Sequence, residues 1–151
     1  MGCDIHGVFQ TKIGDVWVDI PHGLRLQRDY TLFGVLAGVR RPPENVAPVA
    51  EGRGLPKDFV VDDRNDHPTD PECLDVHDRW YWMKYKQREG EPCIEWMGDH
   101  SHSWATGKEM IAWYKAAPEE AKAHVGYFFD EVRSLLYQHN GEIRFVFGFD
   151  S

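Results

Sequence analysis

Hydrophobic and polar residues alternate at both ends of the chain, in residues 3–12 and again in residues 142–150. A period of two is typical of a β-strand, because successive side chains point to opposite faces of a sheet. Asp4 and His6 share one face of the first stretch, and Asp150 lies on the less apolar face of the last. The other face of each stretch is apolar: Cys3, Ile5 and Phe9, then Ile143, Phe145, Phe147 and Phe149. Each end is therefore predicted to be a strand with one buried face.

The other periodic stretches predict a hairpin and three helices. Residues 16–20 are a β-rich run that follows Gly14-Asp15, a pair typical of the turn in a β-hairpin. Apolar residues at helical spacing, with capping residues and prolines at the ends, indicate the helices. The predicted helices are residues 28–40, 105–117 and 118–141.

The middle of the chain follows neither period. Residues 41–79 are rich in Pro, Gly, Asp and Asn, whereas strands are predicted over 78–87 and 91–99. We interpret residues 57–95 as an irregular, insertion-like segment of a single domain that spans residues 1–151. The pattern as a whole predicts an α+β domain. Its mixed or antiparallel sheet contains both terminal strands and is packed on one face by about three helices.

Composition narrows the classes of function. The 151-residue chain has a formal net charge of −8 at pH 7. This charge argues against general nucleic-acid binding and leaves open local phosphate binding or a basic protein partner. Its three cysteines, without a C-x-x-C pair, are typical of a reducing cytoplasm. No apolar run reaches the roughly 20 residues of a membrane span, and the first residues do not resemble a signal peptide. We therefore expect a cytoplasmic protein without a membrane partner.

The stretch MGDHSHSW, residues 97–104, holds two histidines one residue apart, and we expect it to be a loop that leads into a helix. In an extended loop, His100 and His102 would present their imidazoles on one side. If the terminal strands are neighbours, their polar groups can join this pair. The predicted metal ligands are then Asp4, His6, His100, His102 and Asp150. Such a His/Asp set suits a divalent ion, zinc first and then manganese or iron.

Other interpretations of these residues stay open. The histidines can cap backbone groups or lie in solvent, and the polar face of the first strand can simply be solvated. Without a metal, the same groups can serve as an acid–base pair. For a reaction, we assign catalytic roles to His6, His102 and Asp4. Arg53 is then a phosphate contact, and Trp104 is a second substrate contact.

Five stretches together resemble a family of small proteins encoded by bacteriophages and prophages. They are MGCDIH, RDYTLFGVLAGVR, RGLP at 53–56, DHSHSW and the closing RFVFGFD. Family members typically carry a D-G-H-S-H-S-W loop, whereas this chain has Gly98-Asp99 before His100, so Asp99 is not carried over as a ligand. The resemblance spans residues 1–150 and brings no activity with it. It implies a phage-encoded protein that works in the cytoplasm of the bacterial host.

Three hypotheses about function follow. The first is a hydrolase, metal-dependent or based on a His/Asp pair, that acts on a phosphoester or nucleotide. The second is a non-catalytic binding protein that captures a host protein or a small signalling molecule. The third is a purely structural polar cluster that ties the chain ends together. Nothing in the pattern specifies an oligomeric state.

Overall fold

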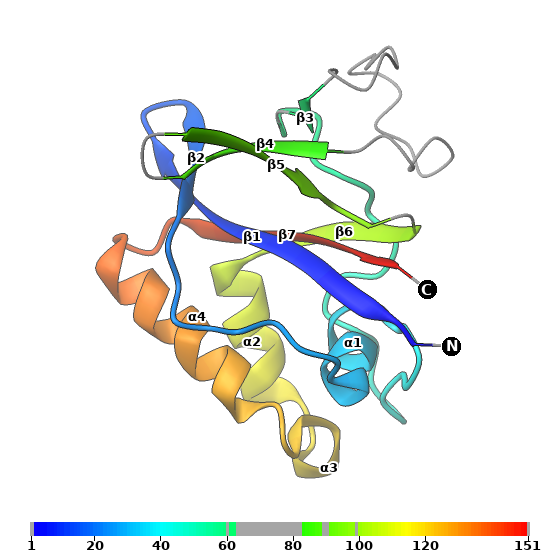
Figure 1. The fold of residues 1–151 in the computed structure, drawn as a ribbon. Helices are drawn as coiled ribbons and strands as arrows, with labels where there is room; N and C mark the ends of the chain where they lie inside the picture. The colour runs from blue at the N-terminus through cyan, green and yellow to red at the C-terminus, as the bar shows by residue number, and fades with distance from the viewer. Residues whose placement is uncertain (1, 60, 63–82, 89–90, 99, 151) are drawn as a thin grey trace.

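The computed structural model describes residues 2–59, 61–62, 83–88, 91–98 and 100–150. Its main sheet has four antiparallel strands in the order β2-β1-β7-β6 (Figure 1). The strands are β1 (Asp4–Ile13), β2 (Val16–Ile20), β6 (His100–Thr106) and β7 (Ile143–Asp150). The two terminal strands therefore lie side by side in the centre of one sheet, which confirms the predicted α+β fold.

Helices cover one face of the main sheet (Figure 1). They are α1 (Tyr30–Ala37), α2 (Gly107–Ala116), α3 (Glu119–Lys122) and α4 (Gly126–Gln138). The prediction of a single helix over 118–141 is wrong. His124, between α3 and α4, has a φ of 68°, and a left-handed residue cannot continue a right-handed helix. The described residues thus form four helices rather than about three. None of these is long and apolar enough to cross a membrane.

Capping residues fix the ends of the helices. The Asp29 side chain accepts a hydrogen bond from the Leu32 N–H at the start of α1, and Gly38 ends that helix with a φ of 72°. This helix is therefore shorter than the predicted 28–40. Thr106 and Glu109 form a reciprocal capping box at the start of α2.

A second, three-stranded antiparallel sheet comes from the middle of the chain, in the order β3-β4-β5. Its strands are β3 (Val61–Asp62), β4 (Met83–Arg88) and β5 (Glu91–Trp96). Strand β4 overlaps the strand predicted over 78–87 and runs one residue beyond it, and β5 falls within the strand predicted over 91–99. The rest of the predicted 57–95 segment lies largely outside the described residues.

The main core lies between the sheet and the helices. Seven phenylalanines are fully buried: Phe9, Phe33, Phe128, Phe129, Phe145, Phe147 and Phe149. Burial of each such side chain stabilises the fold by about 1.5–3 kcal/mol. The opposite face of the sheet, called here the outer face, carries a smaller buried cluster: Val8, Leu55, Phe59, Met97 and Val146. The central strands are therefore buried on both faces. The polar side chains of the outer face lie next to this apolar cluster.

Candidate functional site

The HSHSW stretch is strand β6 rather than the predicted loop, and a β-bulge interrupts it. His100 lies opposite Phe149 and Ser103 lies opposite Phe147, so two residues of β6 face Gly148 of β7. Ser101, inside the bulge, has a φ of 55°. A bulge inserts one residue into the alternation of a strand and turns the side chains beyond it to the other face.

The bulge separates the two imidazoles that were expected to share a side. His100 stacks on Phe149 on the helix side, with ring centroids 6.1 Å apart, and its Nδ1 lies 2.9 Å from the Ser101 hydroxyl. His102 turns to the outer face, where it is 2% exposed, and its Nε2–H donates to the Gly98 carbonyl at 3.0 Å. The two imidazoles therefore do not share a side of β6, contrary to the expectation for an extended loop.

His6 and Asp150 do meet across the chain ends. The antiparallel register of β1 and β7 sets Asp4 opposite Asp150 and His6 opposite Gly148. The His6 Nε2 lies 2.7 Å from the Asp150 Oδ2, and the two side chains are 25% and 21% exposed. This partly buried pair is the contact that strand parity and adjacent termini predict.

Gly148 brings His102 beside this pair. The His102 ring lies over Gly148, where a Cβ would come within 2.6 Å of the ring Cδ2 and would overlap the Met97 carbonyl oxygen. Gly98 has a φ of 82°, and a Cβ on it would overlap the Phe149 backbone. Two glycines thus let the chain that enters β6 cross over β7. His6 and His102 consequently flank Gly148 on the outer face.

Asp4 is held by an arginine. The Arg28 Nε donates to the Asp4 Oδ1 at 2.6 Å, and its Nη2 donates to the Oδ2 at 3.2 Å. The Arg28 guanidinium lowers the pKa of the Asp4 carboxyl below its usual range. The predicted ligand Asp4 therefore serves as the ionised partner of Arg28, which sequence spacing did not indicate.

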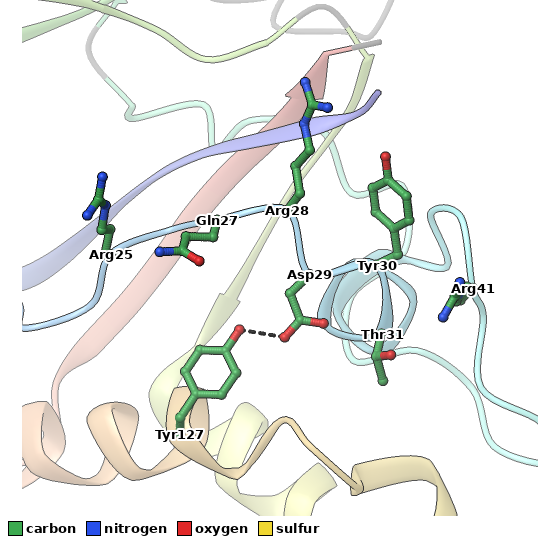
Figure 2. Close-up of a pocket in the computed structure, with 8 residues that line it drawn as sticks. All are labelled: Arg25, Gln27, Arg28, Asp29, Tyr30, Thr31, Arg41 and Tyr127. Carbon is green, nitrogen blue, oxygen red and sulfur yellow. Dashed lines mark hydrogen bonds between the residues drawn. The ribbon is translucent and has the colours of Figure 1, made fainter. Parts of the chain in front are cut away.

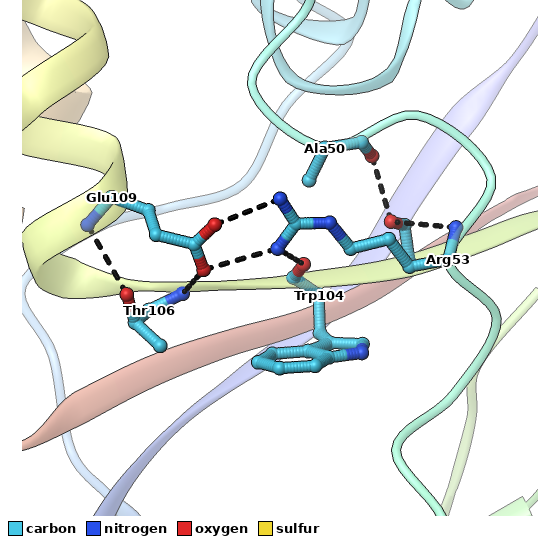
Figure 3. Close-up of polar contacts among 6 residues, drawn as sticks. Ala50, Arg53, Trp104, Thr106 and Glu109 are labelled. Carbon is cyan, nitrogen blue, oxygen red and sulfur yellow. Dashed lines mark hydrogen bonds and ion pairs between the residues drawn. The ribbon is translucent and has the colours of Figure 1, made fainter.

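The predicted substrate contacts Arg53 and Trp104 belong to a clamp at the start of α2 (Figure 3). The Arg53 guanidinium makes two hydrogen bonds to the Glu109 carboxylate, at 3.0 and 2.8 Å, and a third to the Trp104 carbonyl. It also lies 5.5 Å from the centre of the Trp104 ring. The hydrogen bonds from Arg53 to the Glu109 carboxylate lower the pKa of Glu109. The geometry gives Arg53 a structural task that the sequence did not reveal.

The buried Arg144 was also not identified as a site residue from the sequence. Arg144 is 3% exposed, and its Nε and Nη1 each donate at 2.8 Å, to Gln10 and to Asp58. Its guanidinium also lies 4.3 Å from the centre of the Trp17 ring. Burial lowers the pKa of Arg144, and the ion pair with Asp58 opposes that shift. The only signal in the sequence was a charged residue in the middle of an aromatic strand.

The predicted metal ligands do not converge in the described part of the chain. Asp4 binds Arg28, His100 lies on the helix side, and His102 binds a backbone carbonyl. Among the side chains that the structure describes, no group of three or more His, Cys, Asp or Glu is placed to hold an ion. Asp99 lies outside those residues. His6 and Asp150 are the predicted ligands that contact each other.

Comparisons with protein-family models, with curated proteins and with solved structures found no match to this chain. The resemblance to phage-encoded proteins thus stays a prediction from five short stretches.

Proposed function

We propose that this chain is a hydrolase that acts on a phosphoester or nucleotide in the cytoplasm of a bacterial host, with His6 as its general base. The observation that carries the proposal is the 2.7 Å contact between the His6 Nε2 and the Asp150 carboxylate. A carboxylate that accepts the Nε2 proton fixes the tautomer and ring orientation of an imidazole. It also stabilises the imidazolium that forms when the ring takes a second proton.

The reaction follows the chemistry of a His/Asp pair. As the general base, the His6 imidazole accepts a proton from a water molecule while the water oxygen forms a bond to phosphorus. The bond from phosphorus to the leaving oxygen breaks, and the imidazolium returns the proton to that oxygen. His102 and Asp4 act as positioning residues, because the first holds the Gly98 backbone and the second holds Arg28. A divalent ion, zinc first and then manganese or iron, stays a prediction that elemental analysis tests.

The test is turnover of nitrophenyl phosphate mono- and diesters and of common nucleotides, measured with added zinc, manganese or iron and with a chelator. His6→Gln and Asp150→Asn are each expected to lower kcat by about 10²–10⁴-fold, the usual contribution of a general base. His139→Gln, a change at the end of α4, is the matched control and should leave kcat unchanged. Absence of turnover by the wild-type protein, or unchanged kcat in His6→Gln, would refute the proposal.

A second candidate is a non-catalytic binding protein, and one observation favours it. Several predicted site residues are already engaged by the fold: His102 with Gly98, Asp4 with Arg28, and Arg53 with Glu109 and Trp104. Such a rigid surface suits capture of a host protein or small signalling molecule, and the net charge of −8 suits a basic partner. Binding without any turnover distinguishes this candidate from the hydrolase.

A further inference from the structure

Arg144 is a buried cation whose guanidinium the fold satisfies only in part. Its neighbours Ile143 and Phe145 in β7 face the core, so its side chain points to the outer face. The Nε donates to Gln10 and the Nη1 donates to Asp58. The buried Nη2 is the one buried side-chain nitrogen or oxygen, among the residues that the structure describes, without a hydrogen-bond partner. Because buried polar groups are nearly always hydrogen-bonded, Arg144 keeps one donor for a ligand.

The polar groups beside Arg144 on the sheet are already used. The Gln10 amide accepts from the Arg144 Nε through its Oε1 and donates to the Asp19 Oδ1 through its Nε2, each at 2.8 Å. The Trp17 ring covers the guanidinium, since its centre lies 4.3 Å from the Arg144 Cζ. An acceptor for the Nη2 is therefore expected from outside the main sheet.

Asp58 marks the route from solvent to this guanidinium. The Asp58 side chain is 59% exposed and that of Arg144 is 3% exposed, yet the Oδ1 of Asp58 lies 2.8 Å from the Nη1. One carboxylate therefore spans the distance between the surface and the buried cation. Arg53 shows the complete geometry, because its Nη1 and Nη2 donate to the two oxygens of Glu109 at 3.0 and 2.8 Å (Figure 3). Asp58 makes only the first of these two contacts with Arg144, and is an incomplete ligand for it.

Exposed arginines do not have this property. The Arg28 side chain, which lines an open pocket in Figure 2, is 57% exposed and donates to Asp4 through two nitrogens. Water satisfies the donors that such a side chain leaves free, and an exposed ion pair contributes little. A charge-assisted hydrogen bond to a buried donor is stronger, because the surroundings screen it less than water does. An anion is therefore held more strongly at Arg144 than at the surface.

A phosphate group fits this position better than a second carboxylate does. The ligand must displace Asp58, which competes as part of the same chain and therefore at a high effective concentration. A free carboxylate has the same charge as Asp58. A phosphate group carries a larger negative charge at pH 7 and three acceptor oxygens, and two of these oxygens can accept from the Nη1 and the Nη2 of Arg144 together.

We propose that Arg144 binds a phosphate group, free or carried by a small ester, and that Asp58 is the internal carboxylate that occupies Arg144 when no phosphate is bound. On binding, the Asp58 carboxylate turns into solvent and the phosphate oxygens accept from the Nη1 and the Nη2. Arg144 lies opposite Gln10, four residues along β1 from His6, a separation of about 13 Å at a rise of about 3.3 Å per residue. This binding goes beyond the proposed hydrolysis at His6 and is measured without turnover, so failure of either proposal leaves the other standing.

The experiment is titration calorimetry with inorganic phosphate, glycerol phosphate and acetate, with sodium chloride holding the ionic strength constant. Asp58→Asn should lower the Kd for phosphate about tenfold, the factor by which a competitor that fills the site about nine-tenths of the time weakens the apparent affinity. Asp130→Asn is the matched control, because it removes an equal charge from an exposed acid that pairs with Arg133. It should change Kd less than about twofold. Arg144→Lys keeps the charge without the fork of donors and should raise Kd at least about tenfold.

His6→Gln should leave the Kd for phosphate unchanged. Glycerol phosphate that binds as tightly as phosphate assigns the site to esters, and weaker binding assigns it to free phosphate. The proposal is overturned by absence of saturable phosphate binding to Asp58→Asn, by equal changes in Asp58→Asn and Asp130→Asn, by acetate binding as tightly as phosphate, or by loss of binding in His6→Gln. Thermal unfolding verifies that each variant is folded. If Arg144→Lys does not fold, the two aspartate variants still decide the outcome.

Discussion

Replacement of Gly148 by alanine tests whether the crossing of the Met97-Gly98 segment over β7 holds the outer face together. The new methyl group would lie 2.6 Å from the His102 Cδ2 and would overlap the Met97 carbonyl oxygen. The imidazole can move by rotating its side chain, but the carbonyl belongs to the backbone. We therefore expect the whole Met97-Gly98 segment to lift away from the strand.

The magnitude follows from two terms. Extra volume in a packed site costs about 1–3 kcal/mol. Lifting the segment also breaks the buried hydrogen bond from the His102 Nε2 to the Gly98 carbonyl, and a buried polar group left unsatisfied costs about 1–3 kcal/mol. Gly148→Ala should thus lower the free energy of unfolding by about 2–6 kcal/mol. For a chain of this length, that corresponds to a fall in Tm of at least about 4 °C.

Urea and thermal unfolding, followed by circular dichroism, measure the effect. Gly23→Ala is the matched control, since a Cβ there would lie 3.5 Å from the Glu131 carboxylate, an ordinary contact. A double-mutant cycle with His102→Ala separates the two contacts, because truncation of the ring should not rescue Gly148→Ala while the Met97 oxygen still blocks the methyl. A loss no larger than that of Gly23→Ala, or full rescue by His102→Ala, would refute the reasoning.

Two further predictions concern titratable groups. The Arg53 guanidinium lowers the pKa of Glu109 in the folded state, so the stability from this pair is fully present above the unfolded pKa of 4.5 and is lost as the pH falls through the folded value. The Tm difference between wild type and Glu109→Gln should therefore shrink below pH 4.5, and a constant difference from pH 7 to 3 would contradict this pKa shift. Cys3 is fully buried, and burial raises the pKa of its thiol. In a Cys73→Ser/Cys93→Ser background at pH 8, thiol reagents should label Cys3 only after unfolding, and labelling at the rate of a free cysteine in native buffer would show that the site is open.

The terminal strands show what alternation can predict. In β7 the spacing of Phe145, Phe147 and Phe149 assigned one face to the core, and these rings are all fully buried. The same parity placed His6 and Asp150 on the other face, and the pairing of neighbouring strands brought them into contact. Periodicity succeeds here because each residue of a regular strand reverses the direction of the side chain.

The errors arise where single residues break a period. One extra residue in the bulge, with Ser101 in the left-handed region, sends His100 and His102 to opposite faces. His124 interrupts a helix whose apolar stripe continues on both sides. Neither Ser nor His requires this conformation, so the sequence carries no local signal for it.

Pairings between distant segments lay beyond sequence reasoning altogether. Arg28 finds Asp4, and Arg144 finds Asp58, across loops whose path depends on the packing of the whole domain. The Tyr127 hydroxyl likewise reaches Asp29 because the start of α4 and the segment before α1 meet. Residue spacing along one element cannot predict which side chains from another element come within reach.

Because β1 pairs with β7 in the sheet, β1 is synthesised long before the strand that it needs as a neighbour. His6 and Asp150 are separated by 144 positions, so β1 must wait for the synthesis of β7 before it gains its second neighbour in the sheet. Until then the β1–β2 hairpin has a vacant backbone edge and the apolar residues Ile13 and Val16, which are exposed even in the finished fold. Contacts so distant in sequence slow folding, and a waiting edge can pair with another nascent chain. We therefore expect aggregation of newly made chains to begin at this edge when pairing with β7 is delayed.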